Sequence, residues 1–281
     1  MKSLYIAWIG LLLFGLINVG IAHDLPETIE KEYSVQGAKL SVDIRIDACE
    51  INVAKSDNPR GLYVKIEYDP GVATPEITYD SNEGEFRLEM EYPFMAPSNE
   101  GHAPIVYVEL PSKPVIDFES HVKAGEMEYH LGDLTLRNCK IKSYAGELTV
   151  DFALPNKTEM ERLSISTSVG ESELKNLGNA QFKKARINNG IGELTVDFAG
   201  LQSTKGTASI DNNLGAVTVS IPRNVPTRMR VKKAGFLTDY QCSGWFTERH
   251  GVYYSRNYTK SGEHLDLLVS SGIGEMDINT H

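Results

Sequence analysis

The phrase Gly-Glu-Leu-Thr-Val-Asp-Phe stands at Gly146–Phe152 and again, unchanged, at Gly192–Phe198. Looser copies begin at Gly125, Gly170, Gly215 and Gly274, and the first five copies start 21, 24, 22 and 23 residues apart. Self-similarity at this period is typical of stacked structural repeats. The chain is therefore predicted to be a stack of rungs in which these six glycines are structural corners.

Each copy is predicted to be a strand, a glycine corner and a second strand. Around Gly192, apolar residues stand seven and five positions before the corner and two and four after it, as Ala185, Ile187, Leu194 and Val196. Such alternation predicts strands with one buried face. The position just before the corner is apolar too (Ala145, Val169, Ile191, Leu214 and Ile273). A unit of about 22 residues cannot bury its own apolar face, so neighbouring units must stack.

The N-terminal segment predicts export. Lys2 precedes an almost wholly apolar run, residues 4–21, and Gly20 and Ala22 provide small residues before a cleavage point. This pattern is typical of a secretory signal peptide, residues 1–22, cut after Ala22. An uncleaved membrane anchor is the alternative, since the run is about long enough to span a bilayer. We expect a periplasmic, outer-surface or secreted protein whose mature chain does not insert into the membrane.

Residues 23–281 are predicted to form a single all-β domain with three parts. Residues 23–118 hold irregular rungs, 119–221 the regular repeats, and 222–281 an aromatic cap and a final rung. Residues 23–33 read as a polar lead-in, 93–104 as a loop and 265–279 as the final rung. Two further units fit the repeat with strain, one around Gly84 and one around Cys49, where the corner glycine is replaced.

Charge and cysteine content limit the partners. The formal net charge is −10, and loss of Lys2 with the signal peptide makes it −11. An acidic chain argues against binding to nucleic acid or to an anionic membrane surface. Cys139 lies on a predicted buried face, as a small hydrophobe. A Cys49–Cys242 disulfide remains an alternative in an oxidising compartment.

The corner phrase at residues 190–198 resembles that of bacterial toast-rack proteins, which include the LiaF-like, cell-wall-active-antibiotics-response proteins and related proposed adhesins. Residues 214–225 and 272–276 follow in the same order, and the resemblance covers residues 39–281. It implies a right-handed, single-stranded β-solenoid in the cell envelope, with no catalytic residues and no cofactor. LiaF-related members act in envelope stress sensing.

An aromatic cluster in the cap is the candidate interaction surface. It comprises Tyr240, Trp245, Phe246, Tyr253, Tyr254 and Tyr258. Such side chains anchor protein interfaces and stack on sugars. The alternative is a hydrophobic cap that covers the end of the stack, as terminal repeats must.

Catalytic and metal sites have weaker support. A glutamate follows most corners (Glu126, Glu147, Glu171, Glu193 and Glu275), which favours a solvated face over a calcium site. Asp151 and Asp197 would be the carboxylates of a polysaccharide-cleaving enzyme, but they recur as part of the repeat. The histidines show no zinc-binding spacing. No catalytic residue or metal ligand is predicted.

The sequence thus predicts a non-catalytic β-solenoid that presents a surface for protein interaction or adhesion in the cell envelope, with a link to envelope stress. Its partner would be an unknown envelope protein or glycan. The alternative function is a carbohydrate-binding or polysaccharide-cleaving β-helix.

Overall fold

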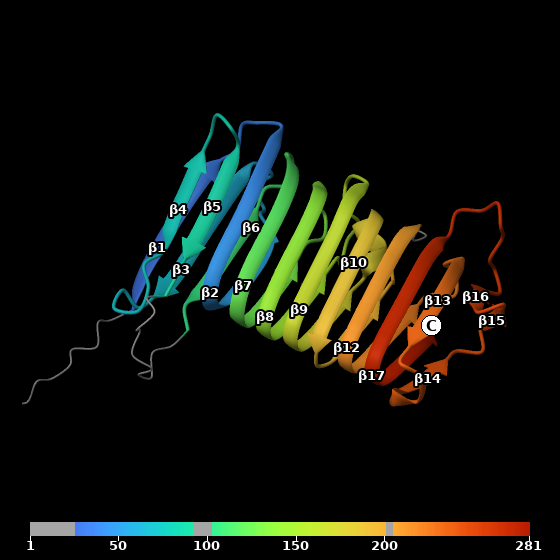
Figure 1. Cartoon of the computed structure of the whole chain (residues 1–281). Coiled ribbons are helices and arrows are strands. Elements are labelled where there is room, and N and C mark those ends of the chain that lie inside the picture. The colour runs from blue at the N-terminus through green and yellow to red at the C-terminus, as the bar shows by residue number, and fades with distance from the viewer. Residues whose placement is uncertain (1–25, 93–102, 201–204) are drawn as a thin grey trace, which may run out of the picture.

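The computed structural model describes residues 26–92, 103–200 and 205–281, so the predicted signal peptide lies outside the described residues. Within them the protein is all-β, as predicted, and its helical elements are two short 3-10 turns, η1 (Leu177–Ala180) and η2 (Gly235–Leu237). The strands form an elongated stack (Figure 1). In chain order they are β1 (Glu27–Ser34), β2 (Lys39–Lys55), β3 (Gly61–Tyr68), β4 (Glu76–Asp80), β5 (Glu85–Met90), β6 (Ile105–Leu110), β7 (Val115–His130), β8 (Leu136–Asp151), β9 (Met160–Lys175), β10 (Phe182–Ile191), β11 (Leu194–Asp197), β12 (Gly206–Ile221), β13 (Thr227–Lys233), β14 (Thr238–Cys242), β15 (Phe246–Arg249), β16 (Val252–Ser255) and β17 (Leu265–Thr280).

The regular repeats pair in parallel and in register. Gly125 of β7 lies opposite Gly146 of β8, which lies opposite Gly170 of β9. Strands β10 and β11 together form the next rung, between β9 and β12. Equivalent residues of successive copies therefore form columns along the stack.

The predicted apolar columns fill the core, with one exception. Ile141, Ile165, Ile187 and Ile210, five residues before their corners, are at most 1% exposed. The residue just before the corner departs from the alternation. Val169, Ile191, Leu214 and Ile273 are 41–48% exposed, because the chain turns at the corner and carries this position out of the core.

Close backbone approach explains the corner glycines. Gly125, Gly146, Gly170, Gly192, Gly215 and Gly274 all have positive φ, between 119° and 133°. A Cβ placed on Gly170 would lie 1.9 Å from the carbonyl oxygen of Gly146, well inside van der Waals contact. Cys49 stands at the first corner of the row. The strands on its far side, β5 and β6, pair with residues 41–46 and 50–55 of β2, so on that side none of the described strands pairs with the corner itself.

A second column inside the corners is buried and polar. Asn189 and Asn212, three residues before their corners, are 1–2% exposed. The Asn189 Nδ2 donates to the Asn212 Oδ1 at 2.8 Å, and the Asn212 Nδ2 donates to the Gly215 carbonyl oxygen at 3.2 Å. The two amides thus bond to each other and to the backbone of the corner inside the stack.

The N-terminal end differs from the sequence prediction in two places. The polar lead-in contains a strand, β1, which pairs antiparallel with β3. The unit around Gly84 is not a rung: β4 and β5 form an antiparallel hairpin, and β5 pairs with β2. Period-two alternation marks strands but does not say whether the turn between them continues a rung or reverses the chain.

The C-terminal strand does not lie at the end of the stack. β17 pairs with β12 on one side and with β13 and β14 on the other (Figure 1). The chain therefore leaves β12, builds the outermost rung from β13 and β14, and returns to fill the place between them. The β15–β16 hairpin joins this end through β13.

Candidate functional site

The aromatic cluster lies at this C-terminal end, which we call the cap (residues 222–264). The structure divides its six residues into three environments. Phe246 is 9% exposed and belongs to the core. Tyr240 and Tyr253 pack against the core, and the centroids of their two rings are 6.1 Å apart. These three side chains therefore contribute to the core at this end of the stack.

Trp245 lies close to two guanidinium groups. The Arg223 and Arg256 Cζ atoms are 5.6 and 5.1 Å from the ring centroid, within the range of cation–π attraction. An Arg256 Nη2 also donates to the Gly244 carbonyl oxygen at 3.3 Å. These contacts hold Arg256, and the loop after β16, against the β14–β15 connection.

Tyr254 and Tyr258 line a groove of about 720 Å³ on the cap. Their ring centroids are 4.9 Å apart and the rings are inclined at 51°. We call this the cap groove. Its lining is polar, basic and aromatic, and it contains no carboxylate: Arg228, Thr247, Arg249, His250, Val252, Tyr254, Ser255, Arg256, Tyr258 and Lys260.

Strand register builds the floor of the cap groove. Thr247 lies opposite Tyr254, and Tyr254 lies opposite Arg228. Arg228 in turn lies opposite Asp266 on β17, to which its Nε donates at 2.5 Å. The hydrogen bond to Asp266 raises the pKa of Arg228 and fixes its side chain in place.

The basic residues of this site were not predicted from the sequence, because the net charge of the whole chain is acidic. The local signal was present, since the cap has only three acidic residues (Asp239, Glu248 and Glu263) but eight basic ones: Arg223, Arg228, Arg230, Lys232, Lys233, Arg249, Arg256 and Lys260.

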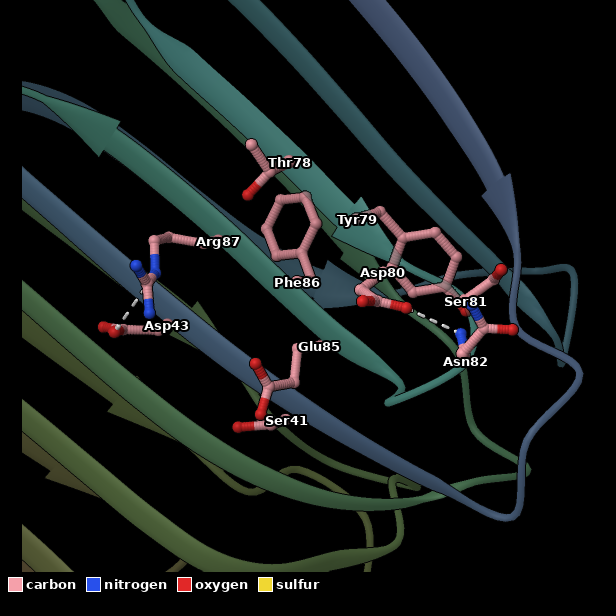
Figure 2. A pocket seen from close by; sticks show the side chains of 10 residues that line it. All are labelled: Ser41, Asp43, Thr78, Tyr79, Asp80, Ser81, Asn82, Glu85, Phe86 and Arg87. Carbon is pink, nitrogen blue, oxygen red and sulfur yellow. Dashed lines mark hydrogen bonds and ion pairs between the residues drawn. The ribbon is translucent and has the colours of Figure 1, made fainter.

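A second hollow of about 570 Å³ lies at the opposite end, between β2 and the β4–β5 hairpin. Figure 2 shows its side chains, with the rings of Tyr79 and Phe86 beside three carboxylate residues, Asp43, Asp80 and Glu85. Its charges are mostly engaged locally. Asp43 pairs with Arg45 at 2.8 Å and with Arg87 at 4.0 Å, and Asp80 accepts the Asn82 backbone N–H at 2.8 Å.

Two exposed rows run along the corners of the stack. The first is aliphatic and consists of the residues just before the corners, in register: Ala145, Val169, Ile191, Leu214 and Ile273. The second consists of the glutamates just after them, of which Glu126, Glu147 and Glu171 lie directly opposite one another. Together they form a continuous amphipathic edge, which we call the corner edge.

The residues considered for catalysis are not brought together. Asp151 lies opposite Lys175 on β9, whereas Asp197 belongs to β11 on the other side of β9, about two strand spacings or 10 Å away. Asp151 accepts a hydrogen bond from Asn176, and Asp197 accepts one from the Ala199 backbone. Neither lines the cap groove or the N-terminal hollow.

In the parts of the chain that the structure covers, no group of three or more His, Cys, Asp or Glu side chains could hold a metal ion. All three cysteines are free, so the Cys49–Cys242 disulfide is not formed. Cys139 is 1% exposed, as predicted, and burial raises the pKa of its thiol to about 12. Across residues 26–92, 103–200 and 205–281, no helix has the length and apolar character needed to cross a bilayer.

Residues 22–162 match the family model for the N-terminal domain of toast_rack, DUF2154. The chain belongs to the toast-rack family. The resemblance to toast-rack proteins, stated from the corner phrase, is thus confirmed. Curated proteins provide no match to this toast-rack chain.

Three solved structures show a low overall similarity to it. A proposed cell adhesion protein from Clostridium sporogenes is 17% identical, over 91% of this chain and 100% of that one, with a TM-score of 0.48. A proposed adhesin from Bacteroides fragilis is 10% identical (90% and 97% covered, TM-score 0.38), and a proposed lipid binding protein from Parabacteroides distasonis is 12% identical (92% and 97%, TM-score 0.35). Likeness at this level transfers neither a ligand nor an activity.

Proposed function

We propose that this toast-rack protein is a non-catalytic, exported module that presents the corner edge to another protein of the cell envelope. The observation that carries the proposal is the in-register aliphatic row. Folding alone gives no reason for a column of Val, Ile and Leu side chains to stay 41–48% exposed on successive rungs. A contiguous apolar row bordered by charge is typical of a protein interaction surface.

The corner edge also favours a particular kind of partner. Its aliphatic row is bordered by glutamates on each copy except at Ala216. A partner segment with an apolar face and flanking basic residues would bury the row and neutralise the carboxylates, and charge complementarity of this kind speeds association.

The proposal includes the finer description of the fold and its setting. The parallel, in-register rungs and the 21–24-residue period support a right-handed, single-stranded β-solenoid, and right-handed crossovers are the rule between parallel strands. We also propose that the signal peptide is cleaved after Ala22 and that residues 23–281 form a single domain. The mature protein would reside in the cell envelope and be linked to envelope stress. Nucleic acid is not part of it.

Site-specific photocrosslinking in cells tests this proposal. A photoreactive residue replaces Ile191 or Leu214 in the full chain, and the captured proteins are identified by mass spectrometry. The matched control places the same residue at Thr195, which is exposed on the same rung but outside the row. We expect one dominant envelope protein from positions 191 and 214 and not from 195. Equal capture from all three positions would contradict the proposal.

Carbohydrate binding is a second candidate function, favoured by the cap groove. Of the six aromatic residues first proposed as an interaction surface, Tyr254 and Tyr258 line that groove, and Trp245 orders one of its arginines. Tyr240, Phe246 and Tyr253 support it from the core side.

A further inference from the structure

The cap groove contains cations that the fold does not neutralise. Arg228 is paired with Asp266. By contrast, Arg249 and Lys260 are exposed and have no ion-pair partner among the described residues. Arg256 contacts the Trp245 ring and the Gly244 carbonyl oxygen, and it too forms no ion pair within the described parts of the chain. Unpaired cations around one groove attract an anion, and guanidinium groups bind carboxylate and phosphate groups through two parallel hydrogen bonds.

The groove also offers aromatic surface. Tyr254 and Tyr258 are each half-buried, so part of each ring faces the groove. Tyr258 is fixed by edge contact with His264 at 5.0 Å, and Tyr254 by its place in β16. The face of an aromatic ring is electron-rich. It packs well against the C–H bonds on the face of a sugar ring, which carry partial positive charge.

The basic surface extends beyond the groove along β13. A shallow hollow of about 220 Å³ shares Arg228 with the cap groove and is lined further on by Arg230 and Lys232. Alternation along β13 places these three basic side chains on one face of the strand. The combined surface therefore suits an extended ligand with repeated negative charges better than a single small anion.

We propose that the cap groove and the adjoining face of β13 bind an acidic polysaccharide, a sugar polymer with repeated carboxylate or phosphate groups. Arg249, Arg256 and Lys260 would hold its acidic groups, Tyr254 and Tyr258 would pack against a sugar ring, and Arg230 and Lys232 would contact the next charged unit. This proposal rests on the second candidate function, carbohydrate binding, and its site shares no residue with the corner edge. Either proposal can therefore fail without affecting the other.

Calorimetric titration of the full exported chain tests the proposal. The ligands are oligogalacturonate, its fully methyl-esterified counterpart, a poly(hexosyl phosphate) and inorganic polyphosphate. We expect the charged sugar polymer to bind and the uncharged ester to bind about tenfold more weakly or not at all, with affinity that falls as salt rises. Preference for oligogalacturonate or for the hexosyl phosphate polymer identifies the acidic group as carboxylate or phosphate, and either supports the proposal.

Two variants test whether the ligand binds in the cap groove. The double variant Arg249→Gln/Lys260→Gln changes two exposed side chains, so the fold should survive, and we expect about tenfold weaker binding. Tyr258→Leu removes one of the two aromatic rings that line the groove. It should weaken binding of the sugar polymer but not binding of polyphosphate. The control is Arg186→Gln, an exposed arginine on β10 outside the groove.

Four results would overturn the proposal. They are unchanged affinity in the double variant, equal binding of the methyl ester, polyphosphate binding as tight as that of the sugar polymers, and self-association that the double variant abolishes. The last would mean that the groove binds a second copy of this chain instead. Sedimentation velocity of the wild type and the double variant distinguishes that case.

Discussion

The regular rungs, β7 to β12, and the cap are built from the same kind of strand, but they differ in how they use their surface. In the rungs, each position recurs, and several exposed cations pair with an acidic residue one strand away, as Arg137 pairs with Asp117 and Lys140 with Glu119. In the cap the repeat is broken, and Arg249, Arg256 and Lys260 surround a groove without a carboxylate. The repeated rungs form a regular scaffold, whereas the interruption of the repeat in the cap brings unpaired basic side chains together around one groove.

The N-terminal hollow strengthens this contrast. It is comparable in size to the cap groove, yet Asp43 and Arg87 neutralise each other and Asp80 caps a turn. Its charges stabilise the fold around it. A hollow thus becomes a candidate site only where its polar groups are left without local partners.

The largest expected effect tests the rung core. Ile187 is 1% exposed and Ile191, four residues along the same strand, is 48% exposed. Ile187→Asp should lower the free energy of unfolding by about 5 kcal/mol, since it buries an unpaired charge and leaves a cavity. Ile191→Asp should cost less than about 1 kcal/mol. Thermal melts followed by circular dichroism give both values, and a cooperative, wild-type-like melt of Ile187→Asp would refute the rung assignment.

A smaller but still large effect is expected at the corners. Gly170→Ala should lower the free energy of unfolding by about 3 kcal/mol or more. The φ of Gly170 is 133°, and the new Cβ would lie 1.9 Å from the Gly146 carbonyl oxygen. The matched change in the cap is Gly244→Ala, where no atom lies within 4 Å of the Cβ. Urea denaturation should show near-wild-type stability for Gly244→Ala. Equal loss in the two variants would remove the distinction between rung and cap.

Thiol reactivity separates the two regions without a change in fold. The thiolate is the reactive form of cysteine. Burial raises the pKa of Cys139 to about 12, whereas Cys242 in the cap is only partly buried. Iodoacetamide at pH 8 should therefore modify Cys242 first, and peptide mass spectrometry over time measures the order. Modification of Cys139 as fast as Cys242 would show that the rungs open as readily as the cap.

The same pKa shift predicts a fall in stability at high pH. The Cys139 thiol ionises near pH 9 when unfolded but near pH 12 when folded. Its contribution is thus fully present below pH 9 and is lost as the pH rises toward 12. Comparison with Cys139→Ala, which should fall less steeply over this range, isolates the contribution from that of other groups.

The smallest effect is expected at a repeated surface position. Glu193→Gln should change the free energy of unfolding by no more than about 0.5 kcal/mol, because Glu193 is exposed. Thermal melts with and without calcium provide the measurement. A clear loss of stability in the variant would show that the glutamate row helps to hold the rungs together. The same would follow if calcium shifted the melting midpoint of the wild type but not of the variant.

The amino-acid sequence by itself determined the stack. Glycine at six of the corners, and apolar residues at fixed offsets such as Ile165 and Ile187, report local φ requirements and a period-two face, which are properties of a short segment. The family resemblance followed from the same phrase. These features could be read without knowing which segments pair.

Only the tertiary structure decided the rest. It placed β17 inside the stack, turned the Gly84 unit into a hairpin, and exposed Ile191 while it buried Asn189. It also gathered Arg228, Arg249 and Lys260 around Tyr254 and Tyr258. These outcomes depend on which distant strands meet and on where the chain turns out of the core. The alternation of residues within one strand predicts neither the pairing of distant strands nor the place of the turns.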